Sequence, residues 1–248
     1  MAEPGQEAGR IPARQPGARA IDQPLQESPA QPPAAARLER FGCIILAAGS
    51  SSRMGKPKQL IQIGGRPLVV RAVEAALGSS VWPVIVVLGA HAEKVRPSLA
   101  RLPVLAVENA AWPEGMASSI RTGITSLRQF ARKLDGAIIA LCDQPAFSAD
   151  VISRLIAAQR QTGRSIAAAQ YPGRCGAPAL FMRTHFDALA SLTGEEGARN
   201  LLNGDPGSVA AIEMPELAAD LDTPEDVARF QSASKPPAPA MPGHPSPA

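Results

Sequence analysis

The sequence predicts an α/β fold with a mostly parallel sheet, on the basis of three features. Apolar runs alternate along the chain with amphipathic segments of helical period, a pattern typical of strands joined by helical crossovers. The run 43–48 carries no polar side chain, as expected of a strand that is covered on both faces. The stretch 41–231 has the length of one α/β domain. We therefore expect three layers, α/β/α, with the sheet between two layers of helices.

Each apolar run is expected to form a strand, and each amphipathic segment a helix. The expected strands are 43–48, 83–89, 103–107, 136–142, 165–169 and 179–182. The expected helices are 66–77, 93–101 and 149–161, one that follows the loop 108–120, and a last one that begins after Thr223. Ligands of such sheets bind at the carboxyl ends of the strands. The loops that follow the strands are therefore the candidate sites.

Both ends of the chain are rich in proline. Residues 1–40 contain seven prolines and residues 232–248 contain six, out of 25 in the whole chain. Such segments bury too little apolar surface to offset the chain entropy lost on folding. We expect two disordered tails, 1–40 and 232–248, around one domain at 41–231. The N-terminal tail balances its arginines with acidic residues, so it is not a basic arm for nucleic acid.

The overall composition argues against nucleic acid or a membrane as a partner. The formal net charge is +3 over 248 residues, and Lys and Arg gather only in the loop after the first strand. No apolar run approaches the roughly 18 residues that span a bilayer. The three cysteines, Cys43, Cys142 and Cys175, are odd in number and form no C-x-x-C pair. This usage suits the reducing cytoplasm, where we expect the protein to work.

The loop after the first strand has the character of a phosphate-binding loop. Gly49 and Gly55 permit backbone angles that let loop N–H groups point at an anion, and Arg53, Lys56 and Lys58 lie within six residues of one another. A Walker A loop is excluded, because five residues separate the two glycines and Lys56 precedes proline rather than Ser or Thr. A dinucleotide-binding fingerprint is excluded because serine stands at its second glycine position.

The segment from Leu46 to Leu60 reads L-A-A-G-x-S-x-R-M-G-x-P-K-x-L. It resembles the signature of the nucleotidyltransferases that activate sugars, isoprenoid precursors and the molybdenum cofactor. The resemblance implies a Rossmann-like nucleotidyltransferase fold in which this loop wraps the triphosphate of an NTP, with Arg53 and Lys58 on the phosphates in catalytic roles. The nucleotide-binding residues that it implies in this loop are Leu46, Ala47, Ala48, Gly49, Ser50, Ser52, Arg53 and Lys58.

A second loop, 108–120, places small residues and two hydroxyl groups at the expected start of a helix. Such groups suit an anion or the edge of a base, and ordinary capping by Ser118 or Ser119 is the alternative explanation. The pattern N-x-x-W-x-x-G-M-x-x-S resembles the second nucleotide-contacting loop of the molybdopterin cytidylyltransferase branch. The nucleotide-binding residues that it implies here are Asn109, Gly115, Met116, Ser118 and Ser119.

Asp143 directly follows the expected strand 136–142. A lone carboxylate that faces a cationic loop and a triphosphate is well placed to hold magnesium, a hard cation that favours oxygen ligands. Capping of the next helix is the alternative, but Ser148 is the better N-cap. In the resembling family this Asp and the Asp before Thr-Pro-Glu-Asp hold the metal, which implies Asp143 and Asp222 as ligands of Mg²⁺ and Asp143 as a catalytic residue. Only the resemblance separates Asp222 from Asp220, which points the same way on an extended segment.

The segment 171–178 is expected to form a loop, and its glycines and arginine suggest a lid over the second substrate. The acceptor-binding residues that the resemblance implies are Arg174, Cys175, Gly176, Pro178 and Arg199. For two of these residues, Cys175 and Arg199, another role is also open. Cys175 is either a spectator thiol or a contact to a dithiolene-bearing acceptor. Arg199 either binds the acceptor's phosphate or pairs with one of the glutamates just before it.

The absence of a Ser-His-Asp set or a histidine pair fits nucleotidyl transfer. His91, His185 and His244 are scattered along the chain, and we expect them to be solvated. A phosphate monoester has its second pKa near ~6, so an acceptor phosphate is already largely a dianion at neutral pH and needs no general base. The protein is left to align the reacting groups and to neutralise charge.

The resemblance covers nearly all of residues 42–231 and is closest to the MocA-like molybdenum cofactor cytidylyltransferases, which join CMP to molybdopterin. It implies CTP and a molybdopterin-type phosphorylated acceptor as substrates, Mg²⁺ as cofactor, and an apo molybdenum hydroxylase as a further partner. Ala48 favours CTP, because the guanylyl branch commonly has glycine there. A guanylyltransferase, a sugar-phosphate cytidylyltransferase and a non-catalytic carrier of the finished cofactor remain the alternatives.

Overall fold

The computed structural model describes residues 39–171, 174–205 and 207–233. The two predicted tails lie almost wholly outside these residues, so their disorder stays a prediction. The first strand begins at Phe41 and the last helix ends at Ala233, close to the predicted limits of the domain. Within the described residues, no helix has both the length and the apolar character needed to cross a membrane.

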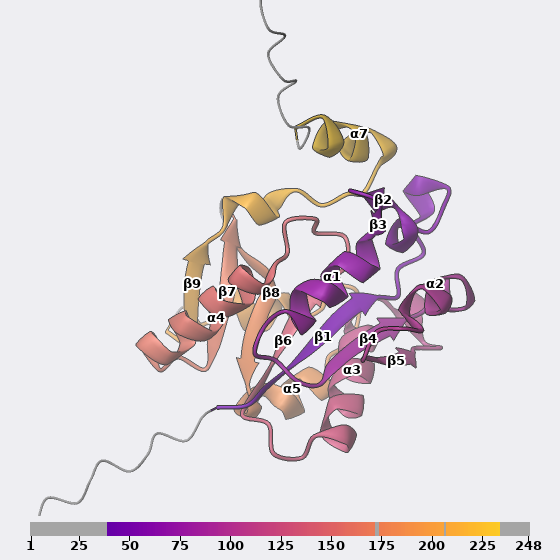
Figure 1. Ribbon diagram of the computed structural model, residues 1–248. Coiled ribbons are helices and arrows are strands. Elements are labelled where there is room, and N and C mark those ends of the chain that lie inside the picture. The colour runs from indigo at the N-terminus through magenta and orange to yellow at the C-terminus, as the bar shows by residue number, and fades with distance from the viewer. Residues whose placement is uncertain (1–38, 172–173, 206, 234–248) are drawn as a thin grey trace, which may run out of the picture. The chain divides into compact units, whose positions relative to one another are not determined.

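Strands and helices alternate along the described chain (Figure 1). The strands are β1 Phe41–Ala47, β2 Gln62–Ile63, β3 Arg66–Pro67, β4 Val84–Leu88, β5 Leu105–Glu108, β6 Gly136–Leu141, β7 Ile166–Tyr171, β8 Arg174–Met182 and β9 Val209–Glu213. The helices are α1 Leu68–Leu77, α2 Ala92–Leu99, α3 Met116–Phe130, α4 Ala149–Thr162, α5 Phe186–Ala190, α6 Arg199–Asn203 and α7 Pro224–Ala233. The helix predicted to start at Arg66 starts only at Leu68, because Arg66 and Pro67 pair with β2 as a short antiparallel ribbon.

Seven strands form one sheet in the order β5-β4-β1-β6-β8-β7-β9. The strands from β5 to β6 are parallel, and Cys43 of β1 lies beside Val84 of β4 and Ile138 of β6. Strand β8 runs antiparallel to both of its neighbours, β6 and β7. The prediction of a mostly parallel sheet is confirmed. Because β1, β4, β5 and β6 run the same way, the loops that follow them lie at one edge of the sheet.

The side chains of β1 alternate between two cores, one on each face of the sheet. Cys43 and Ile45 belong to the core that α1, α2 and α4 cover, and Ile44 and Leu46 to the core that α3, α5 and α6 cover. Figure 1 shows the sheet between these helices. Burial on both faces explains why β1 is apolar throughout, since each buried aliphatic side chain stabilises the fold by about 1.5–3 kcal/mol. The three-layer prediction is confirmed.

The prediction of a loop at 171–178 is wrong for residues 174–178, which belong to strand β8. The pairing of β7 with β8 shifts register between Ala168 and Ala169, so Ala177 and Pro178 fall in a bulge. A bulge tolerates proline because the missing backbone N–H is not required by the ladder there. The turn residues of this segment therefore mark an irregular strand rather than a lid. Residues 172–173 lie outside the described residues.

Candidate functional site

The loop after β1 owes its shape to Ser51 and Gly55, which have left-handed backbone conformations with φ of 56° and 64°. Gly49, from which the sequence predicted such freedom, is not in the left-handed region, and a Cβ there would meet no atom within 4 Å. Ser51 is held in its less favourable conformation by its own side chain. Its Oγ accepts a hydrogen bond from the backbone N–H of Lys58 at 3.0 Å, which closes the loop.

Gln59 is fully buried and ties this loop to the sheet. Its Nε2 donates to the carbonyl oxygens of Ala47 at 3.0 Å and Gly49 at 2.8 Å, and its Oε1 accepts from Ser51 Oγ at 3.4 Å. One amide group thus links the end of β1, the first glycine and the left-handed serine. Gln59 was not among the predicted site residues, because no spacing rule marks a glutamine that bonds to backbone carbonyls.

Two histidines expected to be solvated instead make hydrogen bonds. His91 Nε2 lies 2.8 Å from the carbonyl oxygen of Ser50 and so supports the same loop from the residue that precedes α2. His185 Nε2 lies 2.8 Å from Ser165 Oγ, and burial lowers the pKa of its ring. His244 lies outside the described residues.

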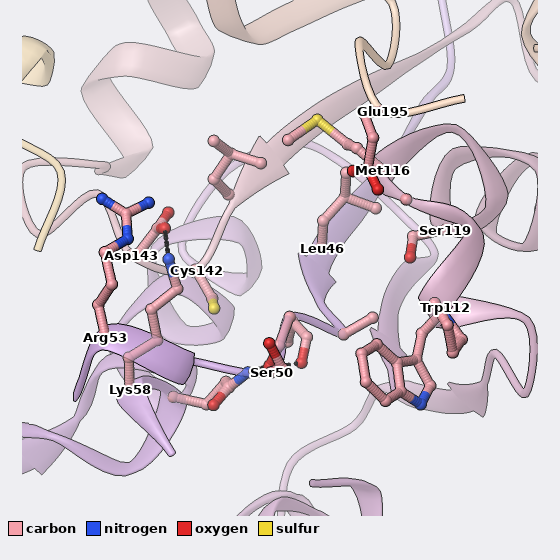
Figure 2. A pocket seen from close by; sticks show the side chains of 17 residues that line it. Leu46, Ser50, Arg53, Lys58, Trp112, Met116, Ser119, Cys142, Asp143 and Glu195 are labelled. Atoms are coloured by element: carbon pink, nitrogen blue, oxygen red, sulfur yellow. Dashed lines mark hydrogen bonds and ion pairs between the residues drawn. The ribbon is translucent and has the colours of Figure 1, made fainter. Parts of the chain in front are cut away.

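Lys58 joins the two carboxylates that the sequence proposed for a metal. Its Nζ forms a close ion pair with Asp143 and lies 3.0 Å from Asp222 Oδ1, and Figure 2 shows the lysine pointing at Asp143. Arg53 approaches Asp222 Oδ2 to 3.4 Å. Burial opposes the charge on Lys58, but the attraction and hydrogen bond of Asp143, with a further bond from Asp222, raise its pKa overall. The ammonium group stays protonated.

The segment that carries Asp222 is held beside the end of β6 by two features. The backbone N–H of Leu221 donates to the carbonyl oxygen of Asp143 at 3.1 Å. Helix α7, which follows, begins with a capping box: Asp226 accepts from Thr223 N at 3.0 Å, and Thr223 Oγ1 accepts from Asp226 N at 3.2 Å. The segment is therefore fixed at both ends, and Asp222 reaches Lys58 from a position far along the chain.

The donor set of this cluster fits a divalent cation. Asp143 is only 8% exposed, and its buried Oδ1 accepts no hydrogen bond from the described residues. It does not cap α4, because Ser148 is the N-cap and accepts from Val151 N. No group of three or more His, Cys, Asp or Glu side chains suited to a metal occurs in the described chain. Two carboxylates leave most of a magnesium ion's octahedral shell to phosphate oxygens and water, as is usual at nucleotide sites.

A cavity of about 430 Å³ opens beside this cluster. Figure 2 shows Lys58 and Asp143 on one side of it, with Trp112 and Ser119 on the opposite side. The predicted nucleotide-binding residues that line it are Leu46, Ala47, Ala48, Gly49, Ser50, Arg53, Lys58, Gly115, Met116 and Ser119. The predicted residues that do not line it are Ser52, Asn109 and Ser118.

Asn109 and Ser118 lie behind the cavity wall and support it. Asn109 Nδ2 donates to the hydroxyl groups of Ser118 at 2.8 Å and Ser119 at 3.1 Å, and Ser118 Oγ donates to the carbonyl oxygen of Gly115 at 2.8 Å. Neither serine caps α3, because its N-cap is Gly115 and no side chain accepts there. The capping alternative therefore does not apply, and the two hydroxyl groups fix the loop to the helix.

The cavity residues that were not in the predicted set are Gln59, Trp112, Pro113, Leu141, Cys142 and Glu195. Glu195 belongs to the turn 194–197, which packs on the start of α3 through a bond from Ala117 N to the carbonyl oxygen of Gly194 at 3.3 Å. The approach is close: a Cβ on Gly115 would lie 2.6 Å from the Glu195 carboxylate. Gly115 also has a φ of 98°, so glycine is required at this position on both counts.

A second cavity of about 200 Å³ adjoins the first and shares Leu46, Met116 and Leu141 with it. The predicted acceptor-binding residues that line it are Arg174, Cys175, Gly176 and Arg199, whereas Pro178 does not. Burial raises the pKa of the half-buried Cys175 thiol, which keeps it protonated. No ion pair joins Arg199 to Glu195 or Glu196 among the described residues, so the guanidinium group of Arg199 is available to an anion.

Asp220 also lines this second cavity. Burial, together with the negative charges of Asp143 and Asp222, raises its pKa to about 6. The sequence alone could not distinguish these two aspartates, but the structure does. Asp222 faces Lys58 and Arg53, and Asp220 faces the second cavity.

Residues 43–211 match the sequence profile of the MobA-like NTP transferase domain. The chain belongs to the MobA-like NTP transferase family. It is 33% identical over 199 residues to the nicotine blue oxidoreductase of Paenarthrobacter nicotinovorans, covering 75% of this chain and 94% of that protein. It is 30% identical over 192 residues to the molybdenum cofactor guanylyltransferase of Rhodobacter capsulatus, covering 77% of this chain and 95% of that protein.

Solved structures of similar sequence share the fold. The homologue of Rv0371c from Mycobacterium sp. strain JC1 superposes with a TM-score of 0.68 and 30% identity, over 79% of this chain and 98% of that one. Rv0371c from Mycobacterium tuberculosis H37Rv in complex with manganese gives a TM-score of 0.63 and 26% identity, over 78% and 98%. The predicted fold and the predicted enzyme class are confirmed: this MobA-like chain is a nucleotidyltransferase.

Proposed function

We propose that this nucleotidyltransferase transfers CMP from CTP to the phosphate of a molybdopterin acceptor and releases pyrophosphate, with Mg²⁺ held by Asp143 and Asp222. The observation that carries the proposal is the position of Lys58. Its ammonium group pairs with both carboxylates and lines the larger cavity, next to the smaller one. A nucleotide in the first cavity and an acceptor in the second would meet where the two cavities join, beside Leu46, Met116 and Leu141.

The triphosphate end of the nucleotide would lie on the loop after β1. Arg53 and Lys58 supply positive charge on the Asp143 side of the cavity, and Gln59 and His91 hold the loop from behind. Charge that develops on the leaving pyrophosphate is stabilised best by groups already fixed in place. Bound Mg²⁺ would add Lewis-acid stabilisation of the phosphoryl oxygens, and the unsatisfied Oδ1 of Asp143 is a ready ligand for it. The manganese complex of the Mycobacterium tuberculosis relative supports a divalent cation.

The reaction needs no protein base. An oxygen of the acceptor's phosphate dianion forms a bond to the α-phosphorus, and the bond from the α-phosphorus to the bridging oxygen breaks. Pyrophosphate leaves with the electron pair of that bond. The enzyme's part is to hold the two phosphates in line, an effect worth up to several orders of magnitude in rate. Arg174 and Arg199, which line the second cavity, would bind the acceptor phosphate.

Ala48 supports cytosine as the base. A Cβ placed on Gly89 would lie 2.8 Å from the Cβ of both Ala48 and Trp112, so these two side chains pack on either side of Gly89, and both line the first cavity. A base bound beside Ala48 would meet its methyl group, which would favour the smaller pyrimidine. The guanylyltransferase from Rhodobacter capsulatus keeps GTP as the alternative, and an Ala48→Gly variant with increased use of GTP would support the assignment.

We propose that the reaction takes place in the cytoplasm and that an apo molybdenum hydroxylase receives the product. The three cysteines are free thiols, and two of them are buried in the cores, where oxidation would find no partner. This usage suits a reducing compartment. Association of the purified chain with such a hydroxylase in a pull-down experiment tests the partner.

Pyrophosphate release by the purified protein with Mg²⁺, each of the four NTPs and molybdopterin tests the proposal. The expected result is release that requires both CTP and molybdopterin. Release with GTP instead would assign the chain to guanylyl transfer, and release with sugar phosphates to that acceptor class. Binding of the finished cofactor with no release from any pair of substrates would favour the carrier.

A further inference from the structure

A groove of about 570 Å³ lies at the edge of the sheet opposite the first cavity. Its walls come from the residues at and just before the starts of β1, β4, β5 and β6 and from the carboxyl end of α3. We call it the amino-end groove. The first cavity, by contrast, is formed at the carboxyl ends of β1 and β6. An occupant of the amino-end groove would therefore leave the first cavity open.

Two exposed aromatic side chains line this groove. Among the described residues, the large apolar side chains that are exposed are Trp82, Met116 and Phe130, at 60%, 42% and 64%. Met116 lines the first cavity, whereas Trp82 and Phe130 both line the amino-end groove. Exposed apolar surface that gathers in one place marks an interaction site, and tryptophan is enriched among the residues that carry most of the binding energy of an interface.

Backbone hydrogen bonds fix the walls of the groove. The backbone N–H of Trp82 donates to the carbonyl oxygen of Phe41 at 2.8 Å. The segment after α3 is held by Arg183, whose Nη1 donates to the carbonyl oxygen of Arg132 at 2.6 Å. The two aromatic side chains thus stand on backbone that is already ordered. Ordering costs on binding are small for a surface of this kind.

The charged side chains of the groove are all positive. Arg40, Arg132 and Lys133 line it, and no aspartate or glutamate of the described chain does. All three are exposed, and none forms an ion pair with another described residue. Two acids lie next to them in the sequence. Glu39 pairs with a residue of α4 at 3.0 Å, and Asp135 accepts the backbone N–H of Arg40 at 2.8 Å. The groove therefore favours an occupant with negative charge.

We infer that the amino-end groove docks an acidic segment of a partner protein, which inserts large apolar side chains against Trp82 and Phe130 and sets its carboxylates on the cationic rim. A second copy of this chain fits poorly, because a two-fold contact through this surface would bring two sets of like charges together. A membrane takes up an apolar face rather than filling a concave groove, and single-stranded nucleic acid needs cations that follow its backbone.

The inference does not depend on which nucleotide or acceptor the enzyme uses. The test selects binders from a library of random peptides displayed on phage, with the full chain as bait. The affinity of each enriched peptide is then measured by fluorescence anisotropy for the wild type and for Trp82→Ser, Phe130→Ser and the double variant Arg132→Glu/Lys133→Glu. Lys94→Glu is the matched control, because Lys94 is exposed on α2 and does not line the groove. Thermal midpoints show that each variant is folded.

The enriched peptides should combine Asp or Glu with large apolar residues. Trp82→Ser and the double variant should each weaken their binding at least about tenfold, and Lys94→Glu should not. High salt should weaken binding to the wild type more than binding to the double variant. If Trp82→Ser is unfolded, Phe130→Ser should show the same loss.

Three results would overturn the inference. The first is a selection that enriches no peptides, or only peptides without acidic residues. The second is binding that persists in the aromatic and charge variants. The third is a different occupant: self-association of the wild type, or its binding to anionic vesicles or single-stranded RNA, that is lost in Trp82→Ser.

Discussion

The ammonium group of Lys58 pairs with the carboxylate of Asp143, although the two residues are 85 positions apart in the sequence. With Asp222 on its other side, the lysine stands between the two carboxylates that are proposed to hold the metal. The cluster therefore holds a cation, the Lys58 ammonium group, between the two carboxylates. If Mg²⁺ binds there with a nucleotide, as proposed, Lys58 would exchange the carboxylates for phosphate oxygens.

Asp143→Asn should lower kcat by at least about 100-fold, the range expected when one fixed group that stabilises the transition state through the metal is removed. The change keeps the size of the side chain, so the fold should persist. Asp187→Asn is the control and should leave kcat unchanged, because Asp187 on α5 forms an exposed ion pair with Arg128 on α3. Near-normal turnover by folded Asp143→Asn protein would remove this residue from the metal site.

Lys58→Met should have opposite effects on catalysis and on metal binding. Turnover should fall about 100-fold, because the variant lacks the positive charge that is proposed to stabilise the triphosphate. Mn²⁺ should bind the nucleotide-free protein more tightly, because the competing ammonium group is gone from between the carboxylates. Isothermal titration with Mn²⁺ checks the second point, with Lys56→Met, the neighbouring exposed lysine, as the matched substitution. Equal Mn²⁺ affinity in wild type and Lys58→Met would contradict the exchange.

Gln59→Leu should raise the KM for CTP about tenfold and leave the KM for the acceptor unchanged. Leucine fills the space but leaves the carbonyl oxygens of Ala47 and Gly49 without their donor, which costs about 1–3 kcal/mol in stability and loosens the loop. Gln159→Leu, at a buried site far from the loop, should lower stability alone. If both variants raised the KM for CTP by the same factor, the proposed role of Gln59 in positioning the loop after β1 would be contradicted.

Gly115→Ala should impair CTP binding, whereas Gly163→Ala should not. Both glycines have positive φ values, 98° and 64°, so both variants should lose roughly 1 kcal/mol or more of stability. Only at Gly115 would the new Cβ also meet the Glu195 carboxylate, at 2.6 Å, and displace the turn 194–197 from the cavity. Steady-state KM values for CTP check the difference, and indistinguishable values for the two variants would rule out this role of the turn.

His185 should make stability fall in mild acid. Because burial lowers the pKa of His185, the folded chain resists protonation of this ring more than the unfolded chain does. Stability is therefore complete above the unfolded pKa, near ~6.5, and decreases as the pH falls through that value toward the lower folded one. His185→Gln should lose less of its thermal midpoint than wild type between pH 8 and pH 5. Parallel curves for the two proteins would exclude the effect.

The sequence predicted the parts of the fold and site that follow from periodicity and from topology. Fully apolar runs such as β1 indicate buried parallel strands, and parallel strands bring their carboxyl ends together. Asp143 and the loop that carries Lys58 could therefore be expected at one edge of the sheet. The position of Asp222 came from resemblance alone, since only the three-dimensional contacts of Leu221 and α7 bring it to Lys58.

The sequence could not predict the residues that act through their tertiary surroundings. Gln59 and Gln144 bond to backbone carbonyls that lie near them only in the folded chain, and no pattern of spacing announces such a contact. The segment 174–178 was wrongly predicted to be a loop for a different reason. Its glycine and proline are typical of a loop, and only the register shift opposite β7 shows that a strand accommodates them.

Transfer of label from [α-³²P]CTP to molybdopterin, with Mg²⁺ and with wild-type or Asp143→Asn protein, tests the central claim most directly. The account predicts a labelled cytidine dinucleotide of molybdopterin with wild-type protein, none when Mg²⁺ is chelated, and a loss of at least about 100-fold with the variant. Absence of labelled product with wild-type protein, or full transfer by the Asp143→Asn variant, would contradict it.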